Sequence, residues 1–220
     1  MNTPFSIFLS GILVKIALYG MYKFIFLGIH LNNVFFIFIA LVSIIDITIK
    51  LFSQVDYKKI IAYCTVFEMN FMIINLFFLA YSTCIYILYF CILHTTFSCL
   101  FFLVNDFLYK RYNTRCITNI FGLYTNITVL PTLLIICIIL FSGLPFTLKF
   151  NIEFFLLIRL LNYDCFVYFI LMFIQFLFII YFFKLNYSLL FNNTHSTAIL
   201  DLSIYEIFPL IYNILVLLVF

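Results

Sequence analysis

Three ionisable residues of different chemistry lie inside segments that are otherwise apolar. Lys15 is in the middle of LSGILVKIALYG (residues 9–20), His94 is in the middle of a later apolar run, and Glu153 lies in a third. An ionisable group in a membrane span is costly, faces protein or water rather than lipid, and usually has a partner. Burial disfavours the charged forms of lysine and glutamate, so a neighbouring charge can decide which group holds a proton. These three residues are therefore predicted to form a proton relay.

Other polar residues in the same runs have roles that their spacing leaves open. Ser98 follows His94 at a spacing that keeps both near one helical face, and Glu68 lies in the preceding run. Lys149 and Glu153 are four residues apart, so they share a helix face and form either a structural ion pair or part of the relay. A single intramembrane histidine can equally be a packing residue. Glu68, Lys149 and Ser98 are therefore kept as candidate neighbours of the relay.

The composition predicts that these residues sit in transmembrane helices. Hydrophobic residues make up 67% of the 220 residues and charged residues 9%, against roughly 45–50% and 25% in soluble domains. In lipid every backbone polar group must be satisfied within a helix or a closed barrel. The alternation of polar and apolar residues that barrel strands require is absent. The sequence therefore predicts an all-α integral membrane protein.

The apolar runs predict about seven transmembrane helices in a single domain covering residues 1–220, since a span needs about 20 residues. The expected spans are roughly 5–28, 34–53, 58–81, 84–105, 125–160, 165–187 and 203–220. The fifth run is too long for one straight span, and proline in Ser142-Gly143-Leu144-Pro145 breaks helices. A discontinuous helix, broken near residues 143–145, is therefore expected. Broken helices at membrane depth mark sites in transporters.

The distribution of basic residues predicts the orientation of the chain. Basic residues follow the second and fourth runs, at Lys58, Lys59, Lys110, Arg111 and Arg115. The loops after the first and third runs have no Lys or Arg. Both basic loops are therefore expected on one side, with the N-terminus on that side and the C-terminus on the other.

Residue usage points to an organellar origin. Phe (33) and Tyr (16) are abundant, Trp is absent, and the favoured residues have AT-rich codons. The N-terminus resembles neither a secretory signal nor an Arg-rich presequence. For a mitochondrial protein, which would be a multi-pass protein of the inner membrane, the predicted orientation places the N-terminus in the matrix and the C-terminus in the intermembrane space.

Motifs for metal, nucleotide or haem binding are missing from the sequence. The seven Cys residues form no CxxC pair, and no Gly-rich nucleotide loop is present. His30 and His195 fall in loops, so no intramembrane pair of haem ligands exists. No cofactor or metal is expected in this chain.

Five sequence blocks, in order, resemble chain 4 of NADH:ubiquinone oxidoreductase, respiratory complex I. The blocks are LVKIALYG around Lys15, FSQVDYKKIIAY (52–63), EMN (68–70), LHTTFSCLFFLVND (93–106) and SGLPFTLKFNIE (142–153). The resemblance runs from about residue 4 to residue 185. Members of that family have about fourteen helices in two inverted repeats, with a broken helix in each half. This chain resembles only the second half of the antiporter-like fold.

The resemblance implies roles for individual residues. Lys15 matches the second of the family's channel lysines, His94 matches its intramembrane histidine, and Glu153 matches the carboxylate of the second broken helix. Two positions depart from the family pattern. Glu68 stands where the family usually has histidine, and Lys149 stands where an uncharged residue is expected.

The implied function is that of a proton-translocating half-subunit in the membrane arm of NADH:ubiquinone reductase (H⁺-translocating). The chain would perform no redox chemistry, because NADH, FMN, Fe–S clusters and ubiquinone would bind other subunits of this respiratory-chain enzyme. The first-half glutamate and lysine of the family are absent, so a separate polypeptide carrying the N-terminal half is the expected partner. Neighbouring antiporter-like chains and membrane lipids are further expected partners, and nucleic acid is not.

Alternatives remain open at this point. The chain could be the corresponding half of chain 2 or chain 5, although a lateral helix after the last span would favour chain 5. It could be a subunit of a cation/proton antiporter. It could also be a non-catalytic scaffold membrane protein whose charges only hold helices together.

Overall fold

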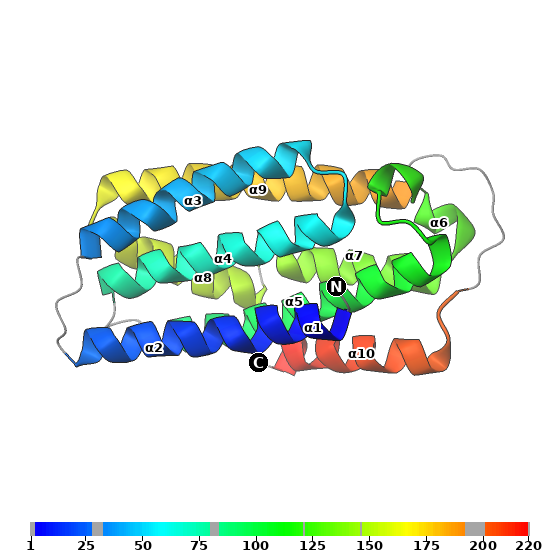
Figure 1. Cartoon of the computed structure of the whole chain (residues 1–220), viewed down its shortest axis with the longest axis horizontal. Helices are drawn as coiled ribbons and strands as arrows, with labels where there is room; N and C mark the ends of the chain where they lie inside the picture. Colours follow the sequence, from blue (N-terminus) through cyan, green and yellow to red (C-terminus); the bar gives the residue numbers. More distant parts are fainter. Residues whose placement is uncertain are drawn as a thin grey trace.

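The computed structural model of the chain describes residues 3–27, 33–79, 84–120, 122–145, 147–191 and 201–219, and within these ranges it is a bundle of helices (Figure 1). The one isolated β-bridge in the described ranges joins Asp56 and Cys116. The elements in chain order are α1 Thr3–Phe8, the π-helix η1 Leu9–Leu13, α2 Val14–Phe26, α3 Asn33–Ser53, α4 Tyr57–Leu79, α5 Cys84–Tyr112, the 3₁₀-helix η2 Ile117–Asn119, α6 Leu123–Asn126, α7 Val129–Phe141, α8 Leu148–Leu161, α9 Cys165–Phe191 and α10 Ile204–Val219.

The all-α membrane fold predicted from composition is confirmed, with a difference in the number of long spans. In the described ranges, five helices are long and apolar enough to cross a membrane, whereas about seven were expected. The two others, Val129–Phe141 and Ile204–Leu217, are apolar but shorter. Helix α7 has 13 residues and is about 20 Å long, less than the roughly 30 Å hydrocarbon core. It therefore needs α8 to complete a crossing.

The predicted discontinuity of the fifth run is confirmed between α7 and α8. Gly143 adopts φ 65°, in the left-handed region that favours glycine and commonly ends helices. The N-terminus of α8 is capped by Thr147, whose hydroxyl accepts a hydrogen bond from the Phe150 N–H at 3.3 Å. The break thus has a defined geometry, with one half-helix ending at Phe141 and the next beginning at Leu148.

Helix α5 is longer than the expected span of 84–105, because it continues to Tyr112. The apolar run ends at the polar residues Asn105 and Asp106. Asp106 instead pairs with Lys110 one turn later at 3.0 Å, and Arg111 reaches Glu206 of α10 at 2.7 Å. These ion pairs stabilise the final turns of α5 outside the apolar part of the helix.

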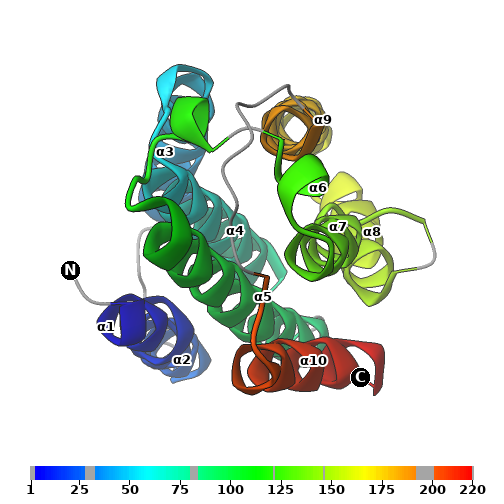
Figure 2. The same ribbon diagram turned by 90° about the vertical axis from the view of Figure 1, so that its right-hand side faces the viewer.

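Helices α4 and α5 occupy the middle of the bundle. Helix α4 contacts α2, α3, α5 and α8, while α5 contacts α1, η1, α7, α8 and α10. Viewed from the end of the bundle, α1 and α2 lie on one side of this pair and α7, α8 and α9 lie on the other (Figure 2). Side chains that project from α4 and α5 into the interior can therefore connect the first helix to the broken one.

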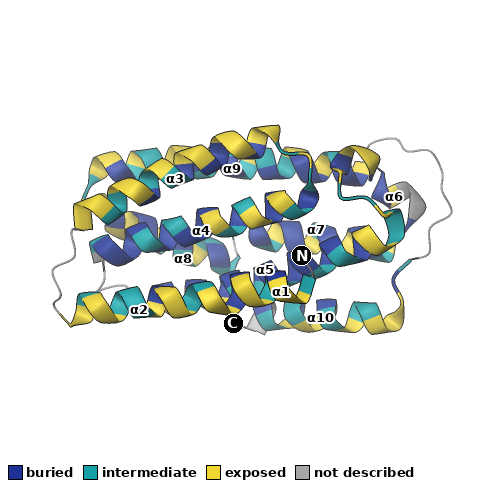
Figure 3. Ribbon diagram, in the orientation of Figure 1, coloured by how far each residue is buried: buried dark blue, intermediate teal, exposed yellow. Residues whose placement is uncertain are grey.

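The outward faces of the peripheral helices are exposed and apolar (Figure 3). On α9, for example, Phe166, Phe169, Phe173 and Phe176 are all more than 60% exposed. An outer surface of this kind suits lipid as the solvent. Buried positions face the other helices, where aromatic rings of α5 and α9 pack around Phe141 of α7.

The two basic loops meet at one end of the bundle. The Tyr57 N–H donates to the Arg115 carbonyl at 3.0 Å, and the Ile117 N–H donates to the Val55 carbonyl at 3.0 Å. The segment before α10 reaches the same end of the fold, because the Asp201 carboxylate accepts hydrogen bonds from the N–H groups of Thr128 and Val129 at the start of α7. The start of α4, the segment after α5 and the segment before α10 are therefore held at this end.

Candidate proton-relay site

Lys15 and His94 are in direct contact between α2 and α5. The Lys15 Nζ lies 2.6 Å from His94 Nδ1 and 2.5 Å from the Ser10 carbonyl oxygen. An ammonium group only donates hydrogen bonds, so Nδ1 accepts and the neutral imidazole carries its proton on Nε2. His94 is thus oriented to take a proton at one ring nitrogen and to release one from the other.

The first helix is deformed just before Lys15. Residues Leu9–Leu13 form a π-helical segment, a rare feature that is frequent at functional sites. Gly11 in this segment lies close to α5, where the Thr95 hydroxyl is 3.5 Å from its carbonyl oxygen and an added Cβ would lie 3.4 Å from the Thr95 methyl group. The close approach of the two helices brings Lys15 within reach of His94.

Glu68 of α4 lies between His94 and the broken helix. Its Oε2 is 3.7 Å from His94 Nε2, and its Oε1 forms an ion pair with Lys149 of α8. The side chains of His94, Glu68 and Lys149 are 2%, 4% and 5% exposed. Buried charges are retained only when they are paired. The structure therefore brings the sequence-predicted neighbours Glu68 and Lys149 into one cluster with His94.

Glu153 continues this cluster one turn further along α8. Its Oε1 is 3.6 Å from Lys149 Nζ. Lys149 also donates a hydrogen bond to the Phe141 carbonyl oxygen, the last residue of α7, at 2.6 Å. The helix break positions this contact, since it places the first turn of α8 beside the end of α7. A polar line thus runs from Lys15 through His94, Glu68 and Lys149 to Glu153.

Ser98 is buried one turn after His94 but has a different partner. Its hydroxyl donates to the Thr95 carbonyl oxygen at 2.9 Å. It lines a cavity of about 10 Å³ together with Glu68 and His94, which is room for about one water molecule. Ser98 is therefore placed beside the gap between His94 and Glu68.

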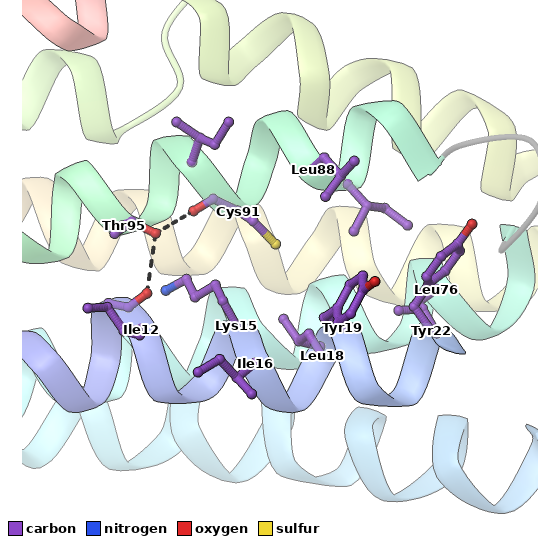
Figure 4. Close-up of a pocket in the computed structure, with 13 residues that line it drawn as sticks. Ile12, Lys15, Ile16, Leu18, Tyr19, Tyr22, Leu76, Leu88, Cys91 and Thr95 are labelled. Atoms are coloured by element: carbon purple, nitrogen blue, oxygen red, sulfur yellow. Dashed lines mark hydrogen bonds between the residues drawn. The ribbon is translucent and has the colours of Figure 1, made fainter. Parts of the chain in front are cut away.

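The outer end of the polar line opens onto a groove of about 520 Å³ between α2, α4 and α5. Figure 4 shows Lys15 reaching from α2 toward α5, with Cys91 and Thr95 on the facing helix. Most of the lining is apolar, as with Ile16 and Leu88. Lys15 is thus half-buried, with its ammonium directed at His94.

Comparisons with known proteins identify the family. The model of the NADH:quinone oxidoreductase/Mrp antiporter transmembrane family matches residues 1–180. This chain belongs to that family. It is 38% identical over 157 residues to NADH-ubiquinone oxidoreductase chain 4 of Paramecium tetraurelia, covering 70% of this chain and 33% of that one. It is 28% identical over 226 residues to NADH-quinone oxidoreductase subunit M of Rickettsia bellii (strain RML369-C), covering 99% and 46%. The chain spans between a third and a half of the length of these two relatives.

Chains of two solved respiratory membrane complexes share the fold. A chain of the membrane-bound sulfane sulfur reductase, an archaeal respiratory membrane complex, matches 99% of this chain and 45% of its own length, with a TM-score of 0.88 and 16% identity. A chain of respiratory complex I from Thermus thermophilus matches 85% and 40%, with a TM-score of 0.72 and 20% identity.

The two positions that were expected to depart from the chain 4 pattern, Glu68 and Lys149, are partners in the structure. Glu68 and Lys149 form the buried ion pair that links α4 to α8. In the sequence they are 81 residues apart, so the contact between them could not be predicted from spacing. The contact between this carboxylate and this lysine keeps the buried charge balanced.

Sequence reasoning missed Gln175 of α9. This side chain hydrogen-bonds Glu153 and lines a cavity with Glu68, Lys149 and Glu153. Its carbonyl oxygen, Oε1, has no hydrogen-bond partner among the described residues. The available signal was a side-chain amide in the middle of the apolar run 165–187.

The pair Asp46 and Lys50 lies outside this cluster. Lys50 Nζ lies 2.5 Å from Asp46 Oδ2, and the two side chains are about half exposed. An exposed i,i+4 pair of this kind contributes little to stability. Asp46 and Lys50 therefore serve as a reference for charges that take no part in the polar line.

Proposed function

We propose that this chain is the C-terminal half of chain 4 of mitochondrial NADH:ubiquinone oxidoreductase and that it relays protons across the inner membrane. The observation that carries the proposal is the continuous line of ionisable groups from Lys15 to Glu153. Each successive pair lies within 3.7 Å. Four helices, α2, α5, α4 and α8, contribute to it, which a set of unrelated local ion pairs would not require.

The relay works by transfer of protons between neighbours. Lys15 gives a proton to His94 Nδ1, His94 releases its Nε2 proton toward Glu68, and the acceptor carboxyl becomes neutral. Lys149 then loses one of its two negative partners and interacts more strongly with Glu153. Each transfer changes the charge felt by the next group, and this is how a change at one end reaches the other.

The proposed partner is a separate polypeptide that carries the N-terminal half of chain 4. The alignment covers 33% of the Paramecium relative's length, and a second polypeptide would supply the helices of that relative that this chain does not match. Other membrane-arm subunits and lipids complete the environment. Redox chemistry with NADH, FMN, Fe–S clusters and ubiquinone belongs to other subunits, and this chain contributes to NADH:ubiquinone reductase (H⁺-translocating) as a translocase component.

The proposed orientation places the basic end of the bundle in the mitochondrial matrix. The loops that follow α3 and α5 pair at that end, and the first residues of α1 line a small cavity with Lys58 and Arg115 there. Helix α10 begins beside Arg111 through Glu206 and runs away from this end. This arrangement supports a matrix N-terminus and a C-terminus in the intermembrane space.

The experiment substitutes the two ends of the line separately. Complexes with Lys15→Met or Glu153→Gln should assemble, oxidise NADH, and pump fewer protons per NADH in sealed vesicles. Lys50→Met is the matched control, because it removes an exposed lysine from the same membrane domain. Normal pumping by the assembled Lys15→Met complex and by the assembled Glu153→Gln complex would falsify the relay and leave a scaffold role.

A further inference from the structure

The ammonium of Lys149 is surrounded by groups that bind free monovalent cations. It forms an ion pair with Glu68, lies 3.6 Å from Glu153 Oε1, and is 2.6 Å from the Phe141 carbonyl oxygen. The Phe141 ring lies beneath it, with its centroid 3.8 Å from Nζ. Carboxylates, a carbonyl oxygen and an aromatic face are ligands of small cations as well as of lysine.

The position of this ligand set in the fold is as important as its composition. The Phe141 carbonyl is at the C-terminal end of the half-helix α7, where unsatisfied carbonyl groups carry partial negative charge. The ends of half-helices and unwound carbonyl groups coordinate Na⁺ in transporters with broken helices. Here the corresponding point is occupied by a side chain of the same protein.

Two further observations indicate a site rather than a simple ion pair. Lys149 is the cation that faces both Glu68 and Glu153, so removal of its side chain would leave two buried carboxylates at one point. Gln175 Oε1, which has no hydrogen-bond partner among the described residues, lines the same cavity of about 10 Å³. It supplies another oxygen that a cation without a tether could use.

We propose that Lys149 is a tethered cation that fills a monovalent-cation site formed by Glu68, Glu153, Gln175 and the end of α7. The side chain keeps free Na⁺ and ammonium ions out of this site. The contacts of Lys149 alone support cation binding at this site. Its consequence for transport, that Lys149 makes the relay specific for protons, rests on the proposed function.

The test uses an alanine variant and an amine that replaces what the substitution removes. Lys149→Ala deletes three carbon atoms and the ammonium group beyond Cβ, which together correspond to n-propylammonium. The complex with Lys149→Ala is expected to show a rise of several degrees in its dissociation temperature on addition of n-propylammonium or Na⁺. Lys149→Met is the matched control, because methionine removes the charge but fills most of the same volume and should respond weakly.

Equal responses of the alanine and methionine variants to n-propylammonium, ammonium and Na⁺ would overturn the proposal. If the alanine variant does not assemble, recovery of the complex from cells grown with and without n-propylammonium replaces the melting measurement. Recovery that is unaffected by the amine then contradicts the proposal. Both readouts report cation binding, so a failure of the proton relay in the Lys15→Met complex would be recognised separately.

Discussion

Lys149 of α8 and Glu68 of α4 form an ion pair in which both side chains are 5% exposed or less. The pair joins the broken helix to the centre of the bundle and lies between His94 and Glu153. Their contact leaves neither buried charge unpaired.

Removing one partner of this pair should be more harmful than removing both. Lys149→Met leaves Glu68 and Glu153 buried without their cation, and breaking a buried pair costs about 3–5 kcal/mol. The double variant Lys149→Met/Glu68→Gln should recover a large part of that loss. The measurement is the thermal inactivation rate of the assembled complex for the two single variants and the double variant. Additive effects would contradict the coupling of the two residues.

Gly143 is predicted to be intolerant of a side chain. Its φ is 65°, and an added Cβ would lie 3.1 Å from Glu153 Oε2. Gly143→Ala should therefore lower stability by about 1–2 kcal/mol from the left-handed backbone alone, and should also displace Glu153 and reduce proton pumping. Gly20→Ala is the control, because no atom lies within 4 Å of its added Cβ. Similar behaviour of the two variants would show that the conformation of the break is unimportant.

The helical architecture could be predicted from the sequence because lipid restricts which backbone structures can span a membrane. The excess of apolar residues predicted helices, and Gly143 with Pro145 predicted the break between α7 and α8. The extension of α5 to Tyr112 could not be predicted from the sequence, since Asn105 and Asp106 look like the end of a span. Pairing of Asp106 with Lys110 continues the helix beyond the apolar segment.

The candidate site could be predicted only in part from the sequence. Spacing along one helix relates Lys149 to Glu153, and the structure has that pair at 3.6 Å. Spacing cannot relate Glu68 to Lys149, because their contact depends on how α4 packs against α8. Gln175 was missed for the same reason, since its partner Glu153 is on a different helix. The role of all these residues in proton transfer stays a prediction.

Asp201 gives a pH-dependent prediction outside the membrane spans. Burial alone would raise its pKa, but hydrogen bonds from the N–H groups of Val129, Leu202 and Thr128 hold its pKa below the ordinary value. Because its pKa is lowered in the folded chain, the charged Asp201 carboxylate stabilises the fold at any pH above the ordinary aspartate pKa of about 3.9. This contribution is lost as the pH falls through the lowered pKa.

Asp201→Ala should therefore cost about 0.5–2 kcal/mol near neutral pH through loss of the cap on α7, and the difference from the parent chain should shrink in acid. Hydrogen exchange of the Val129 amide measures the effect locally. Asp46→Ala, which removes an exposed carboxylate paired with Lys50, should leave that amide unchanged. A difference that grows as the pH falls would contradict the assigned role of Asp201.

The most direct test of the proton relay is the number of protons pumped per NADH oxidised by a complex that carries His94→Gln. His94 is the link between Lys15 and Glu68, with contacts at 2.6 Å and 3.7 Å. Glutamine keeps a polar side chain in place but cannot exchange protons as imidazole does. We expect an assembled complex that oxidises NADH and pumps fewer protons for each molecule. An unchanged ratio of protons to NADH would contradict the proton relay.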